Sequence, residues 1–317
     1  MIQRLPVLLP AFDNNNIPIC LQSSEKFAPY ASVVVLSILN HISEKYNYDI
    51  IVTTWDMSSN TRNCLVAMAS RDNVRIRVVN IRSLVKKYEN IAKKSSGYNR
   101  FSYTGVARLI LPEYLQSYKK IINLDCDLLV KRDIADLFNH DVSNVCAGGV
   151  MDMVAYTASR NPKEPNFTTE HLFKKLGMKT MRSYLNGGVW ILNLEMIRNR
   201  YTAKQLVDYL IKDGETYRCF EQDVFSSLFQ DDCLVLPFEW NWIVDTMGLI
   251  RGRCKYFDPN DPFINEYVSS EENAYIYHYV TNNKPWKTSV YKHSTEWWKV
   301  AEKSPFIKEI INNTANN

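Results

Sequence analysis

Apolar stretches rich in β-branched residues recur along the chain, separated by segments whose apolar positions follow a helical repeat. Six apolar runs have the length and composition of buried strands: residues 17–22, 49–55, 75–81, 119–125, 144–150 and 187–194. Helical spacing occupies residues 29–43, 61–70 and 105–118 between them. This alternation predicts a Rossmann-like, doubly wound α/β fold, in which helices cover a sheet of parallel strands.

The pattern loosens after about residue 195. Helical spacing returns at residues 202–214 and 221–231, and aromatic loops follow. The sequence has no internal repeat and no linker rich in Pro, Gly and Ser. We therefore expect a single domain over residues 1–317, with an α/β core at about 17–195 and an irregular, helical elaboration at about 196–317.

Composition narrows the functional classes. The 38 Lys and Arg residues exceed the 34 Asp and Glu residues only slightly and are scattered, which argues against a nucleic-acid partner. Seven cysteines without a C-x-x-C pair indicate neither a disulfide framework nor a zinc site, and therefore a reduced, cytoplasmic location. No run approaches the roughly 18 apolar residues that span a bilayer.

Two acidic residues end the apolar run "KKIINLDCD" at residues 119–127. Alternation along a strand would point Asp125 and Asp127 to one face, at the strand end where doubly wound sheets bind ligands. Buried carboxylates need a cation, and paired oxygen ligands suit Mg²⁺ or Mn²⁺. An aspartyl-phosphate phosphatase also places D-x-D after a strand, but usually near the N-terminus and with Thr or Val where this chain has Leu129.

A second chemical signal lies in "YIYHYVTNNKPWK", residues 275–287. His278 ends a strand-like segment, and an imidazole added to two carboxylates favours Mn²⁺ over Ca²⁺. Lys284, fixed before Pro285 and Trp286, is suited to bind a phosphate oxygen.

Five ordered motifs resemble family 8 glycosyltransferases, over about residues 17–306. They are "RFSYTGVARLILPEYL", "INLDCDLLVKRDIADLF", "YLNGGVWILNLEMIR", "FEQDVFSSLF" and "HYVTNNKPWK". The resemblance implies a GT-A type fold with a mixed sheet and a retaining enzyme that moves glucose or galactose from a UDP-hexose. It also implies bacterial relatives, of the group that includes lipopolysaccharide glycosyltransferases and glycogenin.

The resemblance also implies a role for each matching residue. The metal, Mn²⁺ or Mg²⁺, would be held by Asp125, Asp127 and His278, and the diphosphate by Lys284. The UDP-sugar would lie against Ser24, Phe27, Tyr103, Arg108, Asp125, Cys126, Asn186 and Gly188. Gln222, with Glu221 and Asp223 beside it, would lie under the anomeric carbon, and Asp152 at the junction of donor and acceptor.

Two positions depart from the family pattern. Ser24 stands where an Asp usually contacts uracil, and Phe27 replaces a Tyr. A Ser hydroxyl can still accept the uracil N–H, so UDP stays the expected nucleotide. Thr281 replaces a Gly in the loop before Lys284.

The chemistry leaves rival interpretations open. Gln222 is a poor nucleophile, so attack from the leaving-group face is favoured over a covalent intermediate. A nucleotidyltransferase would carry a Gly-rich phosphate loop, and residues 22–30 contain no Gly. A non-catalytic sugar-nucleotide-binding protein of the same fold would be expected to lack a metal ligand.

The acceptor class is predicted more broadly than the donor. It is a glycan, glycolipid or glycoprotein. The aromatic and basic residues of segment 294–311 suit either a packed terminal helix, the favoured interpretation, or peripheral contact with the inner face of a membrane.

Overall fold

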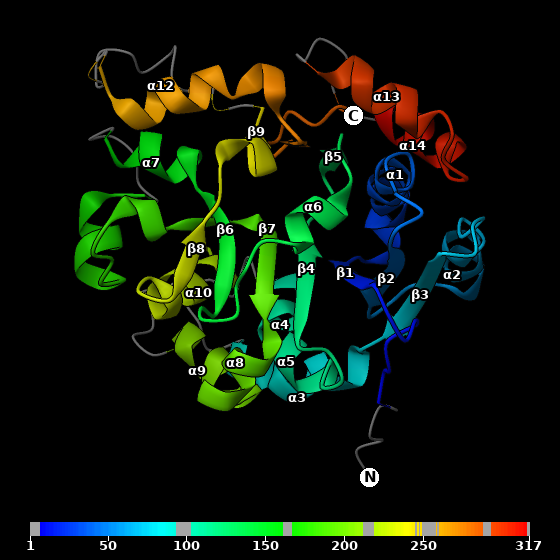
Figure 1. Cartoon of the computed structure of the whole chain (residues 1–317), viewed down its shortest axis with the longest axis horizontal. Helices are drawn as coiled ribbons and strands as arrows, with labels where there is room; N and C mark the ends of the chain where they lie inside the picture. The colour runs from blue at the N-terminus through cyan, green and yellow to red at the C-terminus, as the bar shows by residue number, and fades with distance from the viewer. Residues whose placement is uncertain are drawn as a thin grey trace.

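The computed structural model describes residues 7–92, 103–160, 167–211, 219–244, 246, 248, 258, 260–287 and 293–315. A seven-stranded sheet runs through its centre in the order β3-β2-β1-β4-β7-β6-β8. A second, three-stranded sheet has the order β5-β10-β9, and Figure 1 shows β5 and β9 above the upper ends of the long strands.

The strands have these bounds: β1 Asn16–Gln22, β2 Asn47–Thr54, β3 Val74–Asn80, β4 Lys120–Leu124, β5 Leu128–Val130, β6 Ala147–Met151, β7 Leu185–Asn193, β8 Cys233–Val235, β9 Trp242–Ile243 and β10 Ile276–His278. The six predicted strands correspond to β1, β2, β3, β4, β6 and β7. The strand-like segment that was expected to end at His278 is confirmed as β10, whereas the short strands β5, β8 and β9 were not predicted.

The α-helices are α1 Ala28–Leu39, α2 Ser59–Val66, α3 Arg82–Ala92, α4 Tyr103–Leu109, α5 Leu111–Tyr114, α6 Ile134–Phe138, α7 Met153–Ser159, α8 Leu194–Arg200, α9 Ala203–Asp208, α10 Glu221–Phe229, α12 Pro262–Ser269, α13 Ser294–Ala301 and α14 Ile307–Ala315. Shorter helical turns are η1 Glu25–Phe27, η3 Glu170–Lys175, η4 Met181–Ser183, η5 Tyr209–Ile211, η6 Phe238–Asn241 and η8 Glu271–Asn273.

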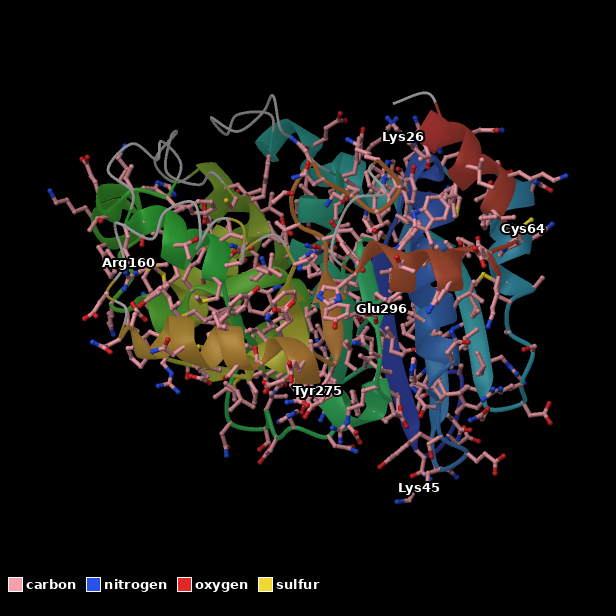
Figure 2. All side chains as sticks on the ribbon, turned by 90° about the horizontal axis from the view of Figure 1, so that it is seen from above. Lys26, Lys45, Cys64, Arg160, Tyr275 and Glu296 are labelled. Carbon is pink, nitrogen blue, oxygen red and sulfur yellow. The ribbon has the colours of Figure 1, made fainter. Side chains whose placement is uncertain are left out.

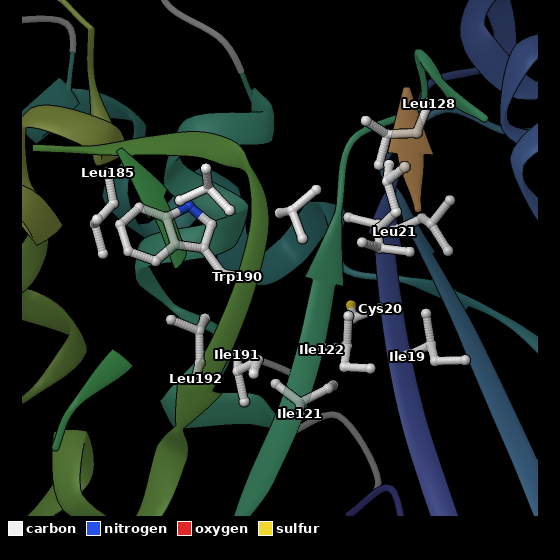
Figure 3. Packing of buried hydrophobic residues seen from close by; sticks show 14 of the residues in the cluster. Ile19, Cys20, Leu21, Ile121, Ile122, Leu128, Leu185, Trp190, Ile191 and Leu192 are labelled. Carbon is white, nitrogen blue, oxygen red and sulfur yellow. The ribbon is translucent and has the colours of Figure 1, made fainter. Parts of the chain in front are cut away.

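The large sheet is mixed. Strands β1, β2, β3 and β4 pair in parallel, whereas β7 runs antiparallel to β4 and to β6. The core lies along these pairings: Ile19, Ile122 and Ile191 are register partners on β1, β4 and β7, all completely buried, and Figure 3 shows them packed side by side. Continuous apolar runs make such strands, because helices cover both faces of the sheet.

Two predicted helices are each divided into shorter helical segments. The helix predicted over residues 105–118 is divided into α4 and α5 at Ile110, because Pro112 has no N–H with which to continue the helical hydrogen bonds. The helix predicted over residues 202–214 forms α9 and then η5, and its end at 212–214 lies outside the described residues.

The C-terminal helices pack on the N-terminal half of the chain. Helices α13 and α14 both contact α1, and Figure 2 shows them, in red, beside the blue N-terminal elements, with Glu296 of α13 labelled. Trp297 is completely buried and Trp298 half-buried, so α13 buries one indole fully and the other in part. Within the described residues, every helix is too short or too polar to cross a bilayer.

Candidate functional site

The small sheet brings together the Asp125–Asp127 motif and the segment of His278, which lie far apart in the sequence. Strands β5 and β10 pair antiparallel with His278 opposite Leu128, and the Tyr279 N–H donates to the Asp127 carbonyl at 3.0 Å. Asp127 immediately precedes β5, and His278 ends β10. The pairing register therefore fixes the imidazole beside the acidic pair.

The acidic pair lies in a bend between strands, which corrects the expectation that both residues belong to one strand. Strand β4 ends at Leu124, and the Asp125 N–H donates to the Gly188 carbonyl on β7 at 2.9 Å. The chain then leaves the large sheet and enters the small one as β5. The carboxylates still converge, because His278 Nε2 lies 3.2 Å from Asp127 Oδ1 and 3.5 Å from Asp125 Oδ2.

Protein cations also flank both acids, although the local sequence offers none. Arg108 of α4 contacts Asp125 through Nη2, and Lys284 Nζ lies 2.5 Å from Asp127 Oδ2. Lys284 also donates to the carbonyls of Tyr279 and Val280. Four of the five Arg108 N–H groups go to protein acceptors: Gln22, Gly187, Glu221 and Asp125.

These contacts perturb the titration of the cluster. Burial disfavours the charged imidazole of His278, but the Asp127 and Asp125 carboxylates outweigh it and raise its pKa to about 9. Burial would raise the pKa of Asp127, yet Lys284 and His278 hold that pKa well below its usual range. The pKa of Asp125 is also lowered, because the charge of Arg108 outweighs the opposing effect of burial. The acids are therefore poised as anions around a protonatable ligand.

The residues of this cluster fit a divalent cation. One atom each of Asp125, Asp127 and His278 lie within 4.8 Å of one another. Asp127 Oδ1 is buried, lacks a conventional hydrogen bond and faces His278 Nε2 at 3.2 Å, so that a cation could bind both atoms. Two carboxylate oxygens and an imidazole nitrogen are a donor set that Mn²⁺ accepts, and Mg²⁺ with less preference for the nitrogen.

The segment Asn186-Gly187-Gly188 shapes this cluster from β7. A Cβ at Gly188 would lie 2.7 Å from His278 Nδ1 and 2.9 Å from Nε2, closer than real Cβ contacts allow. Gly188 is therefore required by the imidazole packed on it. The family resemblance had implied only that Gly188 lies against the UDP-sugar.

Asp152, Asn186 and Gln222 form a buried hydrogen-bonded group beside the cluster. Asp152 Oδ2 accepts from Asn186 Nδ2 at 3.0 Å and from Gln222 Nε2 at 2.9 Å. Gln222 Oε1 accepts from the Gly187 N–H at 2.7 Å, and Asp152 Oδ1 accepts from the Ala155 N–H as the N-cap of α7. Both ends of the Gln222 amide and both oxygens of Asp152 are thus held in place.

The neighbours of Gln222 on α10 point to different partners. Glu221 Oε1 accepts from Arg108 Nη1 at 2.5 Å, and burial raises the pKa of Glu221 although Arg108 opposes the shift. Asp223 is completely buried and accepts from the Tyr184 hydroxyl and the Cys219 N–H. The structure therefore brings Glu221 to the acidic cluster through Arg108 and directs Asp223 toward Tyr184.

The residues predicted to contact the nucleoside lie at the two ends of η1, Ser24 as its N-cap and Phe27 as its last residue. The Ser24 carbonyl accepts from the Ala28 N–H, and the Phe27 ring is 44% exposed. Phe27 meets Tyr30 edge-on, and Tyr30 stacks on Trp286 with ring centroids 3.9 Å apart. The N-terminal motif and the motif around Lys284 therefore pack together.

Two further predicted contacts are positioned by other side chains. Tyr103, at the start of α4, stacks on Trp55 with centroids 5.3 Å apart. Cys126 is buried and its thiol donates to the Gln22 carbonyl at 3.2 Å, while burial raises its pKa. The Cys126 thiol is therefore held as a neutral donor between β1 and the acidic bend.

The site contains residues that the sequence did not single out. Asn241 of η6 bonds both Asn186 and His278, and Gln22 accepts from Arg108. Gly105 lets Glu221 approach α4, since a Cβ there would lie 2.7 Å from Glu221 Oε2. Only the small residue at position 105, inside a helical pattern, offered a sequence signal.

Comparisons with known proteins agree with this arrangement. Residues 18–289 match the model of "Glycosyl transferase family 8". Glycosyltransferase GlyF of Streptococcus pneumoniae is 23% identical over 200 residues, which cover 62% of this chain and 41% of that protein. The chain therefore spans less than half the length of this relative.

Two solved structures share the fold. The bifunctional glycosyltransferase WbbM in its apo form superposes with a TM-score of 0.80 at 23% identity, covering 98% of this chain and 53% of that one. The galactosyltransferase LgtC, in complex with donor and acceptor sugar analogs, gives 0.69 at 19% identity, covering 91% and 96%. The expected GT-A type α/β fold is confirmed.

Proposed function

The chain belongs to glycosyl transferase family 8 and is a glycosyltransferase, and from that premise we propose that it is a retaining, metal-dependent hexosyltransferase. Its donor is UDP-glucose or UDP-galactose, and its acceptor a glycan, a glycolipid or a glycoprotein. The observation that carries the proposal is the convergence of Asp125, Asp127 and His278 at the end of β4. A nucleotide diphosphate binds at such strand ends in doubly wound sheets.

The flanking cations suit an anionic leaving group. Lys284 Nζ lies 2.5 Å from Asp127 Oδ2 and also donates to the carbonyls of Tyr279 and Val280, so all three of its N–H groups have acceptors. This ammonium group borders the acidic cluster and would bind a diphosphate oxygen by exchanging one of these bonds. Arg108 holds Asp125 and Glu221 together at the opposite side of the cluster. When bound, Mn²⁺ or Mg²⁺ supplies Lewis-acid stabilisation of the negative charge that develops on the diphosphate.

The buried amide of Gln222 supports retention by front-face attack. Its two ends bond Gly187 and Asp152, and an amide so held is not a nucleophile. In this proposal the acceptor hydroxyl attacks from the leaving-group side and passes its proton to a donor phosphate oxygen. Gln222 and Asp152 position the sugar, and a hexose ester trapped on Glu221, Asp223 or Asp152 would contradict this course.

The partners and the location of the protein are proposed from its composition and from its C-terminal helices. We propose no nucleic-acid partner, because basic residues are scattered in the sequence. The cysteine pattern supports a cytoplasmic protein. Peripheral membrane contact through α13 and α14 would use their outer face, because Trp297 and Ile310 face the core.

The deciding experiment is the release of UDP from UDP-glucose and UDP-galactose with Mn²⁺. We expect turnover that EDTA abolishes and that Asp127→Asn lowers by at least about 100-fold, since it removes a charged ligand of the cluster. Asp141→Asn, the same change at an Asp that accepts from the nearby Ser143 N–H, is the matched control. UDP binding without turnover would favour the non-catalytic alternative, and metal-independent turnover would refute the proposal.

A further inference from the structure

Asn241 connects the acidic cluster to the group around Asp152. It is only 1% exposed and lies at the end of η6, directly before β9. Its Nδ2 lies 2.9 Å from Asn186 Oδ1, and its Oδ1 lies 2.9 Å from His278 Nδ1. A continuous chain of hydrogen bonds therefore runs from Asp152 through Asn186 and Asn241 to His278.

The direction of this chain is set by a backbone group. The Gly188 N–H can only donate, and it donates to Asn186 Oδ1 at 3.0 Å. The other end of the Asn186 amide, Nδ2, donates to Asp152. A group that bonds Asn186 Oδ1 from the far side must also donate, so Asn241 presents Nδ2 to Asn186 and Oδ1 to His278.

The orientation of Asn241 determines which imidazole nitrogen carries hydrogen. An amide oxygen accepts only from an N–H, so His278 must be protonated at Nδ1. In the neutral imidazole the lone pair is then on Nε2, the atom that faces Asp127 and Asp125 at 3.2 and 3.5 Å. Two carboxylates favour a positive charge at this position, which is either the Nε2 proton of the imidazolium or, once that proton has left, a metal ion bound to the Nε2 lone pair.

We propose that Asn241 is a positioning residue that sets the tautomer and orientation of His278 for cation binding at Nε2. The proposal rests on the proposed function, because the cation is the metal of that site. Residues that hydrogen-bond a metal-bound imidazole typically contribute 10–100-fold to metal affinity, and we expect the same range here. Because Asn241 also binds Asn186, it couples the His278 ring to Asp152 and Gln222.

Two measurements on the full chain test this role. Long-range ¹H–¹⁵N NMR correlations of ¹⁵N-histidine protein with saturating Mg²⁺ report the tautomer, with the His278 signal assigned by its loss in His278→Gln. Mn²⁺ affinity is measured by EPR of the free ion. We expect an Nδ1–H tautomer in the native protein and an affinity reduced about 10–100-fold in Asn241→Leu.

Matched variants separate positioning from general destabilisation. Asn241→Asp keeps an acceptor for Nδ1–H and should keep the tautomer and most of the Mn²⁺ affinity, while losing the donor to Asn186. Asn193 is the last residue of β7, and its side-chain amide donates a hydrogen bond to the Val142 carbonyl. Asn193→Ala removes this bond and should leave Mn²⁺ affinity unchanged.

An Nε2–H tautomer in the native protein, or native Mn²⁺ affinity in Asn241→Leu, would overturn the role of Asn241. The native tautomer tests the proposal even if Asn241→Leu does not fold. Failure of the native protein to bind Mn²⁺ or Mg²⁺ would instead overturn the proposed function, and the inference with it.

Discussion

Replacing Gly188 by Ala should damage the metal site through the His278 ring. The added Cβ would clash most closely with Cε1 of the ring and would also lie 2.7 Å from Nδ1 and 2.9 Å from Nε2. Non-bonded atoms settle at about 3.5 Å, so the ring must move by more than about 1 Å. That movement breaks the 2.9 Å bond from Nδ1 to Asn241. It also exceeds the roughly 0.2 Å within which metal-ligand distances are held.

The expected loss is therefore specific to the metal. We predict that Gly188→Ala lowers Mn²⁺ affinity by about 100-fold and the free energy of unfolding by about 1–3 kcal/mol, the usual cost of overpacking. Mn²⁺ EPR titration with UDP measures the first quantity, and urea unfolding the second.

Gly148→Ala is the matched control on β6. Its Cβ would meet Val142 Cγ1 at 3.3 Å and Ile191 Cδ1 at 3.6 Å, both flexible side-chain ends far from the acidic bend. This variant should bind Mn²⁺ like the native protein. A folded Gly188→Ala protein with native Mn²⁺ affinity would refute the reasoning that Gly188 exists to accommodate His278.

Three further changes test neighbouring parts of the account. The pKa of His278 is raised to about 9, and Mn²⁺ binds only the neutral imidazole, so Mn²⁺ affinity should rise by about tenfold per pH unit from pH 7 toward 9. A pH profile of the native protein as flat as that of His278→Gln would contradict this. Lys284→Met removes the cation paired with Asp127, so it should lower UDP-sugar turnover by about 10–100-fold and raise the Mn²⁺ affinity measured without nucleotide. If both values stayed unchanged, Lys284 would not bind the diphosphate. Trp297→Ala should lower the free energy of unfolding by about 3–5 kcal/mol in urea, and Trp298→Ala, half-buried on the same helix, by less; equal losses would contradict the packing of α13.

Much of the large sheet could be predicted from sequence because its strands are continuous apolar runs. Strands β1, β2 and β3 pair in register over seven or more residues, which is long enough for a pattern to be recognised. Strands β5 and β9 have three and two residues, too few for alternation to show, whereas the segment of β10 was recognised as strand-like up to His278. Their pairing, which builds the site, is non-local and left no trace in the pattern.

The candidate metal ligands could be recognised from the sequence, whereas the residues that position them could not. Asp125, Asp127 and His278 stood out because their residue types suit a metal. Asn241 lies between two tryptophans in "EWNW", where an amide in an aromatic stretch is typical of a loop. The reversal of β7 and the break at Ile110 depend on packing and on Pro112.

We propose that Asp125 and Asp127, from the middle of the chain, and His278, from near its end, hold one metal ion. The most direct test of this proposal is an anomalous scattering map at the manganese edge from crystals grown with Mn²⁺ and UDP. We expect one peak at about 2.1 Å from a carboxylate oxygen of Asp125, a carboxylate oxygen of Asp127 and Nε2 of His278. A peak elsewhere, or His278 outside that distance, would contradict it.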